Sequence, residues 1–438
     1  MTNNDTLAPR HLQAELEAAL AASRIVNIIG PRQAGKTTFV RDIFASERSG
    51  ARFVTLDDQV LLKAIESDPE TQIRALMADI GDNPLIIDEA QRSKTMALAI
   101  KKIVDEDRRK GQFILTGSSN VFTSLEIADS LAGRMRTIKL WPMSIAETLR
   151  RKPSQILDWG IAKSPSLTDL GTPDKLTRSD YIDFILRGGF PEIRELETRD
   201  RGRQYRDYVD SVVDRDVADI LRVRKTDALR QLIEQLAART ACETNTTTLS
   251  RLIATDRKTV DEYMDVLFRL SMIVKLRAWT SSESKRDIKQ PKYHFADTGI
   301  AAALREITPD SFGIDANPTA LGAMLETFVH GELQKSLPYQ QHDFRLYHWR
   351  NERQKEIDIL AESATRLVGI EIKAASTVND ESLKALKDFA KTGPGKSKQF
   401  TGIVFYLGEH KLTFGDGIFA LPVSTLWSKT NPKIAFSK

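Results

Sequence analysis

The first third of the chain alternates short apolar runs with stretches of helical character. The apolar runs are continuous rather than interrupted by polar residues, which is typical of strands buried on both faces of a parallel sheet. The helical segments between them predict a series of right-handed β-α-β units, and hence an α/β domain over residues 1–150. The predicted strands are Ile25–Ile29, Phe53–Leu56, Leu85–Asp88, Phe113–Thr116 and Thr137–Leu140.

Beyond residue 150 the hydrophobic pattern changes twice. Residues 151–225 begin with a stretch rich in Lys, Ser, Pro and Gly and continue as a helical stretch, which predicts a linker and a helical lid. Residues 226–312 contain three helix-like segments followed by two strands, which is the outline of a winged helix. Residues 313–438 return to a mixed α/β pattern, with predicted strands near 356–360, 367–373 and 400–406.

Composition narrows the class of protein. The length of 438 residues is enough for about three domains. The 64 basic and 60 acidic side chains give a net charge of +4, which excludes a uniformly basic nucleic-acid coat but leaves room for a local basic patch. The single cysteine, Cys242, excludes an intrachain disulfide. Residues 1–24 lack the apolar segment of a signal peptide, and no apolar run reaches the roughly 18 residues of a membrane helix. We therefore expect a cytoplasmic protein without a membrane segment.

The segment Gly30–Thr37 fits the pattern G-x-x-x-x-G-K-[ST] of a phosphate-binding loop. It directly follows a predicted strand and precedes a helical run, which is the context that such a loop requires. Its glycines let backbone N–H groups turn toward phosphates, and the helix N-terminus adds positive potential. Lys36 is expected to reach the β- and γ-phosphates and the Thr37 hydroxyl to bind Mg²⁺. The predicted ATP-binding residues are Gly30, Gln33, Ala34, Gly35, Lys36, Thr37 and Thr38.

Two further predicted strands end in polar residues. One ends in Asp88 and is followed by Glu89. Because the carboxyl ends of parallel strands share one edge of a sheet, we expect Asp88 to hold Mg²⁺ through water and Glu89 to polarise the attacking water. The other strand ends in Thr116 and precedes Ser118, which is our first choice for a residue that faces the γ-phosphate. Thr116 and Asn120 are the alternatives.

These motifs resemble those of bacterial and archaeal AAA-type ATPases that carry a C-terminal domain of unknown function. Further matching segments extend the resemblance over nearly the whole chain: Leu131–Arg134, Gly188–Glu192, Pro291–Gly299 and Gly322–Val329. The resemblance implies ATP binding and hydrolysis with Mg²⁺. It also implies a homo-oligomer in which Arg134 or Arg136 acts as an arginine finger in the site of a neighbouring subunit. Arg187 is an alternative, as a phosphate sensor within the same chain.

The predicted winged helix is a candidate DNA-binding module. Its third helix carries side chains of both signs on the exposed face, although a groove-reading helix should be mostly basic. Those side chains are Arg257, Lys258, Asp261, Glu262 and Asp265. The wing loop, residues 284–292, is the better candidate because it has four cations and one acid: Lys285, Arg286, Lys289, Lys292 and Asp287. The alternative is a module that packs between domains or subunits.

A second group of acids lies in the C-terminal segment. Side chains alternate along a strand, so Glu356 and Asp358 share one face, and so do Glu371 and Lys373. If the two strands pair, the acids and the lysine converge on one surface. Asp358, Glu371 and Glu326 are then candidate Mg²⁺ ligands, and Lys373 a catalytic lysine for phosphodiester hydrolysis. The spacing resembles the PD-(D/E)XK nuclease core, which predicts a restriction-endonuclease-like α/β fold. The alternative is a solvated sheet face.

Two functions follow from this organisation. The first is a nucleic-acid-processing ATPase that binds DNA through the winged helix and the C-terminal domain, with or without cleavage. The second is an ATP-dependent regulatory switch that binds a protein partner through the same domains without cleaving DNA. The near-neutral charge and the mixed-sign helix favour the second, and the domain order favours the first.

Overall fold

The computed structural model describes residues 7–48, 50–117, 131, 133–217, 226–282, 286, 289–313, 318–352, 355–391 and 398–429. The chain divides by its internal contacts into two compact units. Unit 1 comprises residues 1–143 together with 269–271, and unit 2 comprises residues 144–268 and 272–438.

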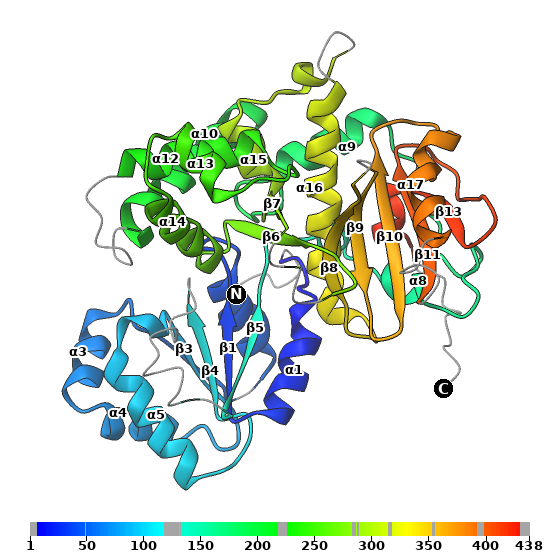
Figure 1. Cartoon of the computed structure of the whole chain (residues 1–438). Coiled ribbons are helices and arrows are strands. Elements are labelled where there is room, and N and C mark those ends of the chain that lie inside the picture. The colour runs from blue at the N-terminus through cyan, green and yellow to red at the C-terminus, as the bar shows by residue number, and fades with distance from the viewer. Residues whose placement is uncertain are drawn as a thin grey trace. The chain divides into compact units, whose positions relative to one another are not determined.

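Unit 1 is built on a five-stranded sheet with the strand order β2-β3-β4-β1-β5, in which all pairs are parallel (Figure 1). The strands are β1 Ile25–Ile29, β2 Arg52–Thr55, β3 Leu85–Asp88, β4 Phe113–Gly117 and β5 Met135–Lys139. They lie within two residues of the predicted ones, which confirms the parallel α/β core. β4 separates β1 from β3, so the strand after the phosphate-binding pattern and the Asp-Glu strand are not neighbours.

Helices cover both faces of this sheet. They are α1 Leu12–Ala22, α2 Lys36–Thr38, α3 Gln59–Ser67, α4 Pro69–Met77 and α5 Lys94–Glu106, with shorter turns η2 Phe39–Phe44, η3 Ala45–Glu47 and η4 Ala90–Arg92. Side-chain caps mark the helix starts: the Asp58 carboxylate accepts the backbone N–H groups of Val60 and Leu61 at the start of α3, and the Ser93 hydroxyl accepts that of Met96 at the start of α5.

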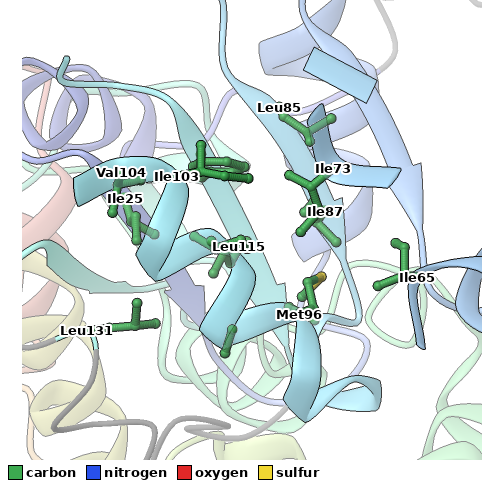
Figure 2. Packing of buried hydrophobic residues seen from close by; sticks show 14 of the residues in the cluster. Ile25, Ile65, Ile73, Leu85, Ile87, Met96, Ile103, Val104, Leu115 and Leu131 are labelled. Atoms are coloured by element: carbon green, nitrogen blue, oxygen red, sulfur yellow. The ribbon is translucent and has the colours of Figure 1, made fainter. Parts of the chain in front are cut away.

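The core of unit 1 explains why its strands are continuously apolar. Ile25, Ile87 and Leu115 point to one face of the sheet and pack against α3, α4 and α5, as Figure 2 shows for Ile65, Ile73 and Met96. The intervening strand residues point to the other face and pack against α1 and η2. Each strand residue therefore meets an apolar neighbour, whichever way it points.

Unit 2 contains helices both before its first strand and between its later strands. These are α7 Ile145–Thr148, α8 Ile156–Gly160, α9 Arg178–Arg187, α10 Thr198–Ser211, α12 Thr226–Ala238, α13 Thr246–Leu252, α14 Arg257–Arg269, α15 Thr298–Leu304, α16 Pro318–Ser336 and α17 Asp380–Lys391. Shorter helical turns also occur in unit 2: η6 Val212–Val217, η8 Pro309–Phe312, η9 Leu337–Tyr339 and η10 Val423–Trp427.

An eight-stranded sheet runs through unit 2, with the order β12-β13-β11-β10-β9-β8-β6-β7 (Figure 1). Its strands are β6 Ile273–Ala278, β7 Lys292–Phe295, β8 Arg345–Arg350, β9 Glu356–Glu362, β10 Arg366–Lys373, β11 Gln399–Tyr406, β12 Leu412–Thr413 and β13 Ile418–Pro422. β9 and β10 are antiparallel neighbours, so the condition on which the predicted convergence of the acids depends is met.

The three helices and the hairpin expected of a winged helix are present as α12, α13, α14, β6 and β7. The hairpin does not stand apart as a free wing, however, because β6 pairs in parallel with β8 at Arg277 and Ala278. Residues 144–268 and 272–438 belong to one contact unit. The division of this part of the chain into a lid, a winged helix and a nuclease-like domain stays a prediction. Within the described ranges, no helix has both the length and the apolar character that a membrane span needs.

Candidate functional site

The loop between β1 and α2 reverses the chain tightly at the carboxyl edge of the unit 1 sheet. Gly30 has a φ of 155°, and a Cβ atom there would lie 2.1 Å from the Leu140 carbonyl oxygen. Gly35, immediately before α2, has a φ of 91°, in the region that favours glycine. A side chain at either position would push the loop away from the strand or strain the loop backbone. The structure therefore explains why the motif has glycine at both positions.

Lys36 is the first residue of α2, and its side chain folds back over the loop. It is buried, and its Nζ donates hydrogen bonds to the carbonyl oxygens of Gly30 at 3.0 Å and Pro31 at 2.8 Å. The ammonium group therefore sits directly above the turn. A cation held in this place is suited to binding an anionic phosphate that enters the loop.

Asp88, at the end of β3, links the loop to two neighbouring strands. Its Oδ2 accepts a hydrogen bond from the Thr37 hydroxyl at 2.8 Å, and its Oδ1 accepts one from the Thr116 hydroxyl at the end of β4. A carboxylate and a hydroxyl side by side are the hard oxygen donors that Mg²⁺ prefers. The predicted pair of Thr37 and Asp88 is thus brought together in a manner that fits Mg²⁺.

Glu89 follows Asp88 in the left-handed conformation, with a φ of 54°. Burial, reinforced by the charge of Asp88, raises the pKa of its carboxyl group above the ordinary value. Its side chain accepts a hydrogen bond from the Gln91 amide. The strained backbone turns Glu89 away from the strand path, and a carboxylate with a raised pKa is a better proton acceptor than an exposed one.

The residue facing the γ-phosphate stays a prediction. Ser118 and Asn120 lie outside the described residues. Thr116 is described, and it is fully buried with its hydroxyl bound to Asp88. In this arrangement Thr116 supports the Asp88 carboxylate.

Arg10 completes the loop's support and was missed by the sequence reading. It is 7% exposed and lies before α1. Its guanidinium donates to the carbonyl oxygens of Ala34 at 2.9 Å and Trp141 at 2.6 Å. It thereby ties the phosphate-binding loop to the segment that follows β5. Local patterns hold no signal for this contact, because its partners are 24 and 131 residues away.

The candidate arginine fingers lie elsewhere. The Ile25 N–H donates to the Arg134 carbonyl oxygen, so Arg134 is beside the start of β1, at the edge opposite the phosphate-binding loop. Its guanidinium forms two hydrogen bonds with Asp105, at 2.5 and 2.9 Å. Arg136 is 3.9 Å from Glu15. In unit 2, Arg187 pairs with Asp183 at 2.6 Å. The finger and sensor roles stay predictions.

In unit 2 the predicted acids of the C-terminal segment do converge. The antiparallel register places Ile370 opposite Ile359, and Glu371 and Asp358 are the next residues along their strands, so both point to the other face of the sheet. The Asp358 carboxylate accepts the backbone N–H of Ile372 at 2.8 Å, and Glu371 pairs with Lys373 at 2.6 Å. Glu326 joins them from α16, which packs against β10 and β7.

A lysine that the sequence reading had placed in the wing loop lies among these acids. Lys292, the first residue of β7, is 3% exposed. Its Nζ is 2.8 Å from the Glu326 carboxylate and 3.9 Å from the Asp358 carboxylate. It also contacts the Glu356 carboxylate. We call these three acids together with Glu371, Lys292 and Lys373 the acid–lysine cluster.

Burial sets the protonation of this cluster. It raises the pKa of Glu326 well above its ordinary value, and raises those of Asp358 and Glu371 as well. Burial alone would lower the pKa of Lys292, but the surrounding carboxylates outweigh it and raise that pKa instead. Lys292 is therefore a permanent cation, whereas burial favours the neutral form of Glu326, Asp358 and Glu371 even though Lys292 and Lys373 lie beside them.

The acid–lysine cluster does not fit the predicted Mg²⁺ site at Glu326, Asp358 and Glu371. The Lys292 ammonium lies in the space between carboxylates that a divalent ion would need. Among the described residues, no group of three or more His, Cys, Asp or Glu side chains is arranged to hold a metal ion. The predicted catalytic role of Lys373 depends on that metal, and in the structure the Lys373 ammonium pairs with Glu371.

Two of the candidate DNA-contacting cations are also buried in ion pairs. Arg286 of the wing loop is buried, with its guanidinium bound to Glu362 at 2.8 Å and to the Tyr347 hydroxyl at 3.0 Å. Together with Lys292, it removes two of the four wing cations from the surface. On α14, Arg257 and Lys258 face Asp261 and Glu262 one turn later, at 3.6 and 4.0 Å.

Comparisons with known families agree with the geometry of unit 1. Residues 22–149 match the family described as an AAA domain. Residues 178–311 and 321–426 match two families described as domains of unknown function, DUF8612 and DUF4143. Residues 22–149 are thus similar to an AAA domain, in agreement with the loop and the acids at the edge of the unit 1 sheet, and they are followed by two regions to which the family matches assign no function. The nuclease-like fold stays a prediction.

Relatives and solved structures add little about function. An uncharacterised protein of Mycobacterium tuberculosis is 27% identical over 95% of this chain and 84% of its own length. One from Methanocaldococcus jannaschii is 24% identical over 52% of this chain and 50% of its own length. Among solved structures, the replication initiator DnaA bound to AMPPCP and single-stranded DNA shares 16% identity, with a TM-score of 0.28, over 59% of this chain and 86% of that one. A STAND ATPase from Pyrococcus horikoshii shares 12% identity, with a TM-score of 0.28, over 76% of this chain and 46% of that one. Similarity this low carries no argument for function.

Proposed function

We propose that unit 1 binds ATP with Mg²⁺ and hydrolyses it. One observation carries the proposal: Asp88 hydrogen-bonds the Thr37 hydroxyl of the phosphate-binding loop, and Glu89 lies beside it at the same edge of the sheet. In a P-loop ATPase these positions hold the metal and activate the attacking water.

Each side chain has one task in this mechanism. Lys36 neutralises the phosphate oxygens, and the backbone N–H groups from Gln33 to Thr38 bind the phosphates. Thr37 and Asp88 would hold Mg²⁺, which supplies charge neutralisation to the phosphates when it is bound. Glu89, with its raised pKa, accepts the proton of the attacking water.

Two substitutions test the assignment. Lys36→Ala should abolish both nucleotide binding and hydrolysis, because the loop loses its buried cation. Glu89→Gln should bind ATP normally but hydrolyse it at least about 100-fold more slowly, as expected for the loss of a general base. Binding is measured with a fluorescent ATP analogue and turnover by phosphate release.

The matched control is Glu66→Gln, the same chemical change at an exposed position of α3. It should leave both binding and turnover unchanged. Normal turnover in Glu89→Gln would refute the assignment of the base.

For unit 2 we propose an ATP-dependent regulatory switch that binds a protein partner without cleaving nucleic acid. Two of the four wing cations are buried in ion pairs, and the α14 cations face acids on the same helix. Burial removes Arg286 and Lys292 from contact with a phosphate backbone, and the acids on α14 offset the charge of its cations, so these two elements give DNA a weak electrostatic attraction. DNA processing, the competing proposal, requires cations outside these two elements.

The effect of DNA on ATP turnover separates the two proposals. Hydrolysis by the full chain is measured with single-stranded, duplex and branched DNA at low salt. The switch predicts the same rate, within about twofold, for all three forms and for no DNA, because the basic groups named above are engaged. Stimulation of about tenfold by one DNA form, lost at high salt, would instead establish DNA processing.

A further inference from the structure

The acid–lysine cluster brings six charged side chains together outside the nucleotide site. Four carboxylates, from Glu326, Glu356, Asp358 and Glu371, meet two ammonium groups, from Lys292 and Lys373. The two ammonium groups together carry the charge of one divalent ion. They come from different elements, β7 and β10, whereas the acids come from α16, β9 and β10.

Lys292 occupies the position that a metal ion would take. Its Nζ is 2.8 Å from Glu326 and 3.9 Å from Asp358, and it contacts Glu356 as well. A Mg²⁺ ion needs carboxylate oxygens at roughly 2.0–2.1 Å. It would have to share the space between these carboxylates with the ammonium, at a distance where two cations repel strongly in a buried site.

The backbone holds Lys292 in this place from both sides. On one side it pairs with Leu276 of β6, and on the other it forms a bridge with Glu243. Next to it, the Thr244 N–H donates to the Pro291 carbonyl oxygen at 3.0 Å. A lysine that merely filled an empty site from a free loop would lack these restraints.

The neighbouring side chains continue the same contact. His294, two residues further along β7, stacks on His330 of α16, with ring centroids 4.2 Å apart. Its Nδ1 is 3.2 Å from the Thr327 hydroxyl, and that hydroxyl also bonds Thr240. The face of β7 that carries Lys292 is therefore packed along α16 beyond the cluster itself.

We infer that Lys292 is the resident cation of the acid–lysine cluster, and that unit 2 takes up no divalent metal there while Lys292 is in place. The nuclease-like acids then form a metal-free charge network that joins β7, β9, β10 and α16. Such a network holds the hairpin to the sheet, and it has no means of activating water for metal-dependent phosphodiester hydrolysis. The inference does not depend on ATP hydrolysis by unit 1.

Binding of Mn²⁺ to the full chain without nucleotide tests the inference, with free Mn²⁺ measured by electron paramagnetic resonance. We expect the wild type to bind no Mn²⁺ at the acid–lysine cluster, so the wild type and Asp358→Asn should bind the same amount of Mn²⁺. Mn²⁺ bound at Thr37 and Asp88 can be told apart from Mn²⁺ at the cluster, because Asp88→Asn removes it and Asp358→Asn does not. Mn²⁺ binding by the wild type that Asp358→Asn abolishes would overturn the inference.

A second variant asks whether Lys292 is what excludes the metal. Lys292→Met keeps an unbranched side chain of similar shape and removes its charge. The variant should therefore gain about one Mn²⁺ per chain, and the gain should be lost again when Asp358→Asn is added. Lys398→Met removes an ammonium paired with Glu362 outside the cluster, and should gain none. A folded Lys292→Met that binds no additional Mn²⁺ would count against the inference. If that variant does not fold, the wild-type measurement decides alone.

Discussion

At the scale of single residues, the nucleotide site depends on a side chain outside its motif. Arg10 holds the loop by two carbonyl oxygens that are more than a hundred residues apart in the chain, those of Ala34 and Trp141. A buried guanidinium that bridges two backbone segments fixes the loop in the shape that receives phosphate, so less ordering remains to be done when the ligand binds.

We therefore predict that Arg10→Ala weakens ATP binding about tenfold or more, since hydrogen bonds from a charged group contribute about 1.5–3 kcal/mol. Turnover at saturating ATP should fall less, because Lys36, Asp88 and Glu89 are retained. Titration with a fluorescent nucleotide measures the affinity. Arg74→Ala, which removes an exposed arginine paired with Glu70, is the control. Equal affinities in the two variants would show that Arg10 has no part in shaping the loop.

At the scale of elements, the sequence predicted unit 1 well because its signals are local. The strands are contiguous apolar runs, and the carboxyl ends of β1, β3 and β4 meet because parallel strands share one edge. The antiparallel pairing of β9 with β10 was a condition of the predicted convergence of the acids, and it joins two strands that are also close in the sequence. The place of β6 and β7 was not, since it depends on β8, about seventy residues further along the chain.

Packing of β7 against α16 also buries two histidines, which should make unit 2 sensitive to acid. Burial lowers the pKa of His330 to about 3 from its ordinary 6.5. Between these values the unfolded chain binds a proton that the folded chain does not, so this histidine costs stability as pH falls, by up to about 1.4 kcal/mol per pH unit. His330→Phe keeps the aromatic ring beside His294 and cannot bind a proton.

The free energy of unfolding of His330→Phe should therefore rise relative to the wild type by about 2 kcal/mol between pH 6.5 and pH 5. Urea unfolding at the two pH values measures this difference. Buried acids whose pKa values are raised have the opposite effect on the free energy of unfolding as the pH falls. They are present in both proteins, so the comparison with the wild type cancels their contribution. The exposed His410→Phe controls for the substitution. A difference that is independent of pH would mean that His330 does not remain neutral in the folded protein.

At the scale of the whole molecule, we propose a homo-oligomer. Arg134 lies at the sheet edge opposite the loop of its own chain, so it can reach a nucleotide only in a neighbouring subunit. Its bidentate pair with Asp105 would have to open for that contact.

Mixing two inactive variants tests this arrangement. Arg134→Ala retains an intact nucleotide site, and Lys36→Ala retains an intact arginine. If the finger acts between subunits, the mixture should regain ATPase activity up to about a quarter of the wild type, because some interfaces combine both intact parts. Arg136→Ala, mixed in the same way, distinguishes the two candidates. Full activity of Arg134→Ala alone would remove it from consideration.

The sequence alone determined the parts of this protein whose chemistry lies in consecutive residues. A phosphate-binding loop is a run of eight residues after a strand, and an Asp-Glu pair at a strand end is equally local, so both could be recognised without a fold. Even the convergence of Asp358 with Glu371 followed from alternation along two neighbouring strands.

Only the tertiary structure decided what stands between those acids. Lys292 is 34 residues before Glu326 and 66 before Asp358, and nothing in its local sequence distinguishes a buried counter-ion from a solvated wing cation. The same holds for Arg10 and Arg286. The physical reason is that a charge is attracted to whatever partner the fold brings within a few ångströms, and that partner is set by packing between distant segments.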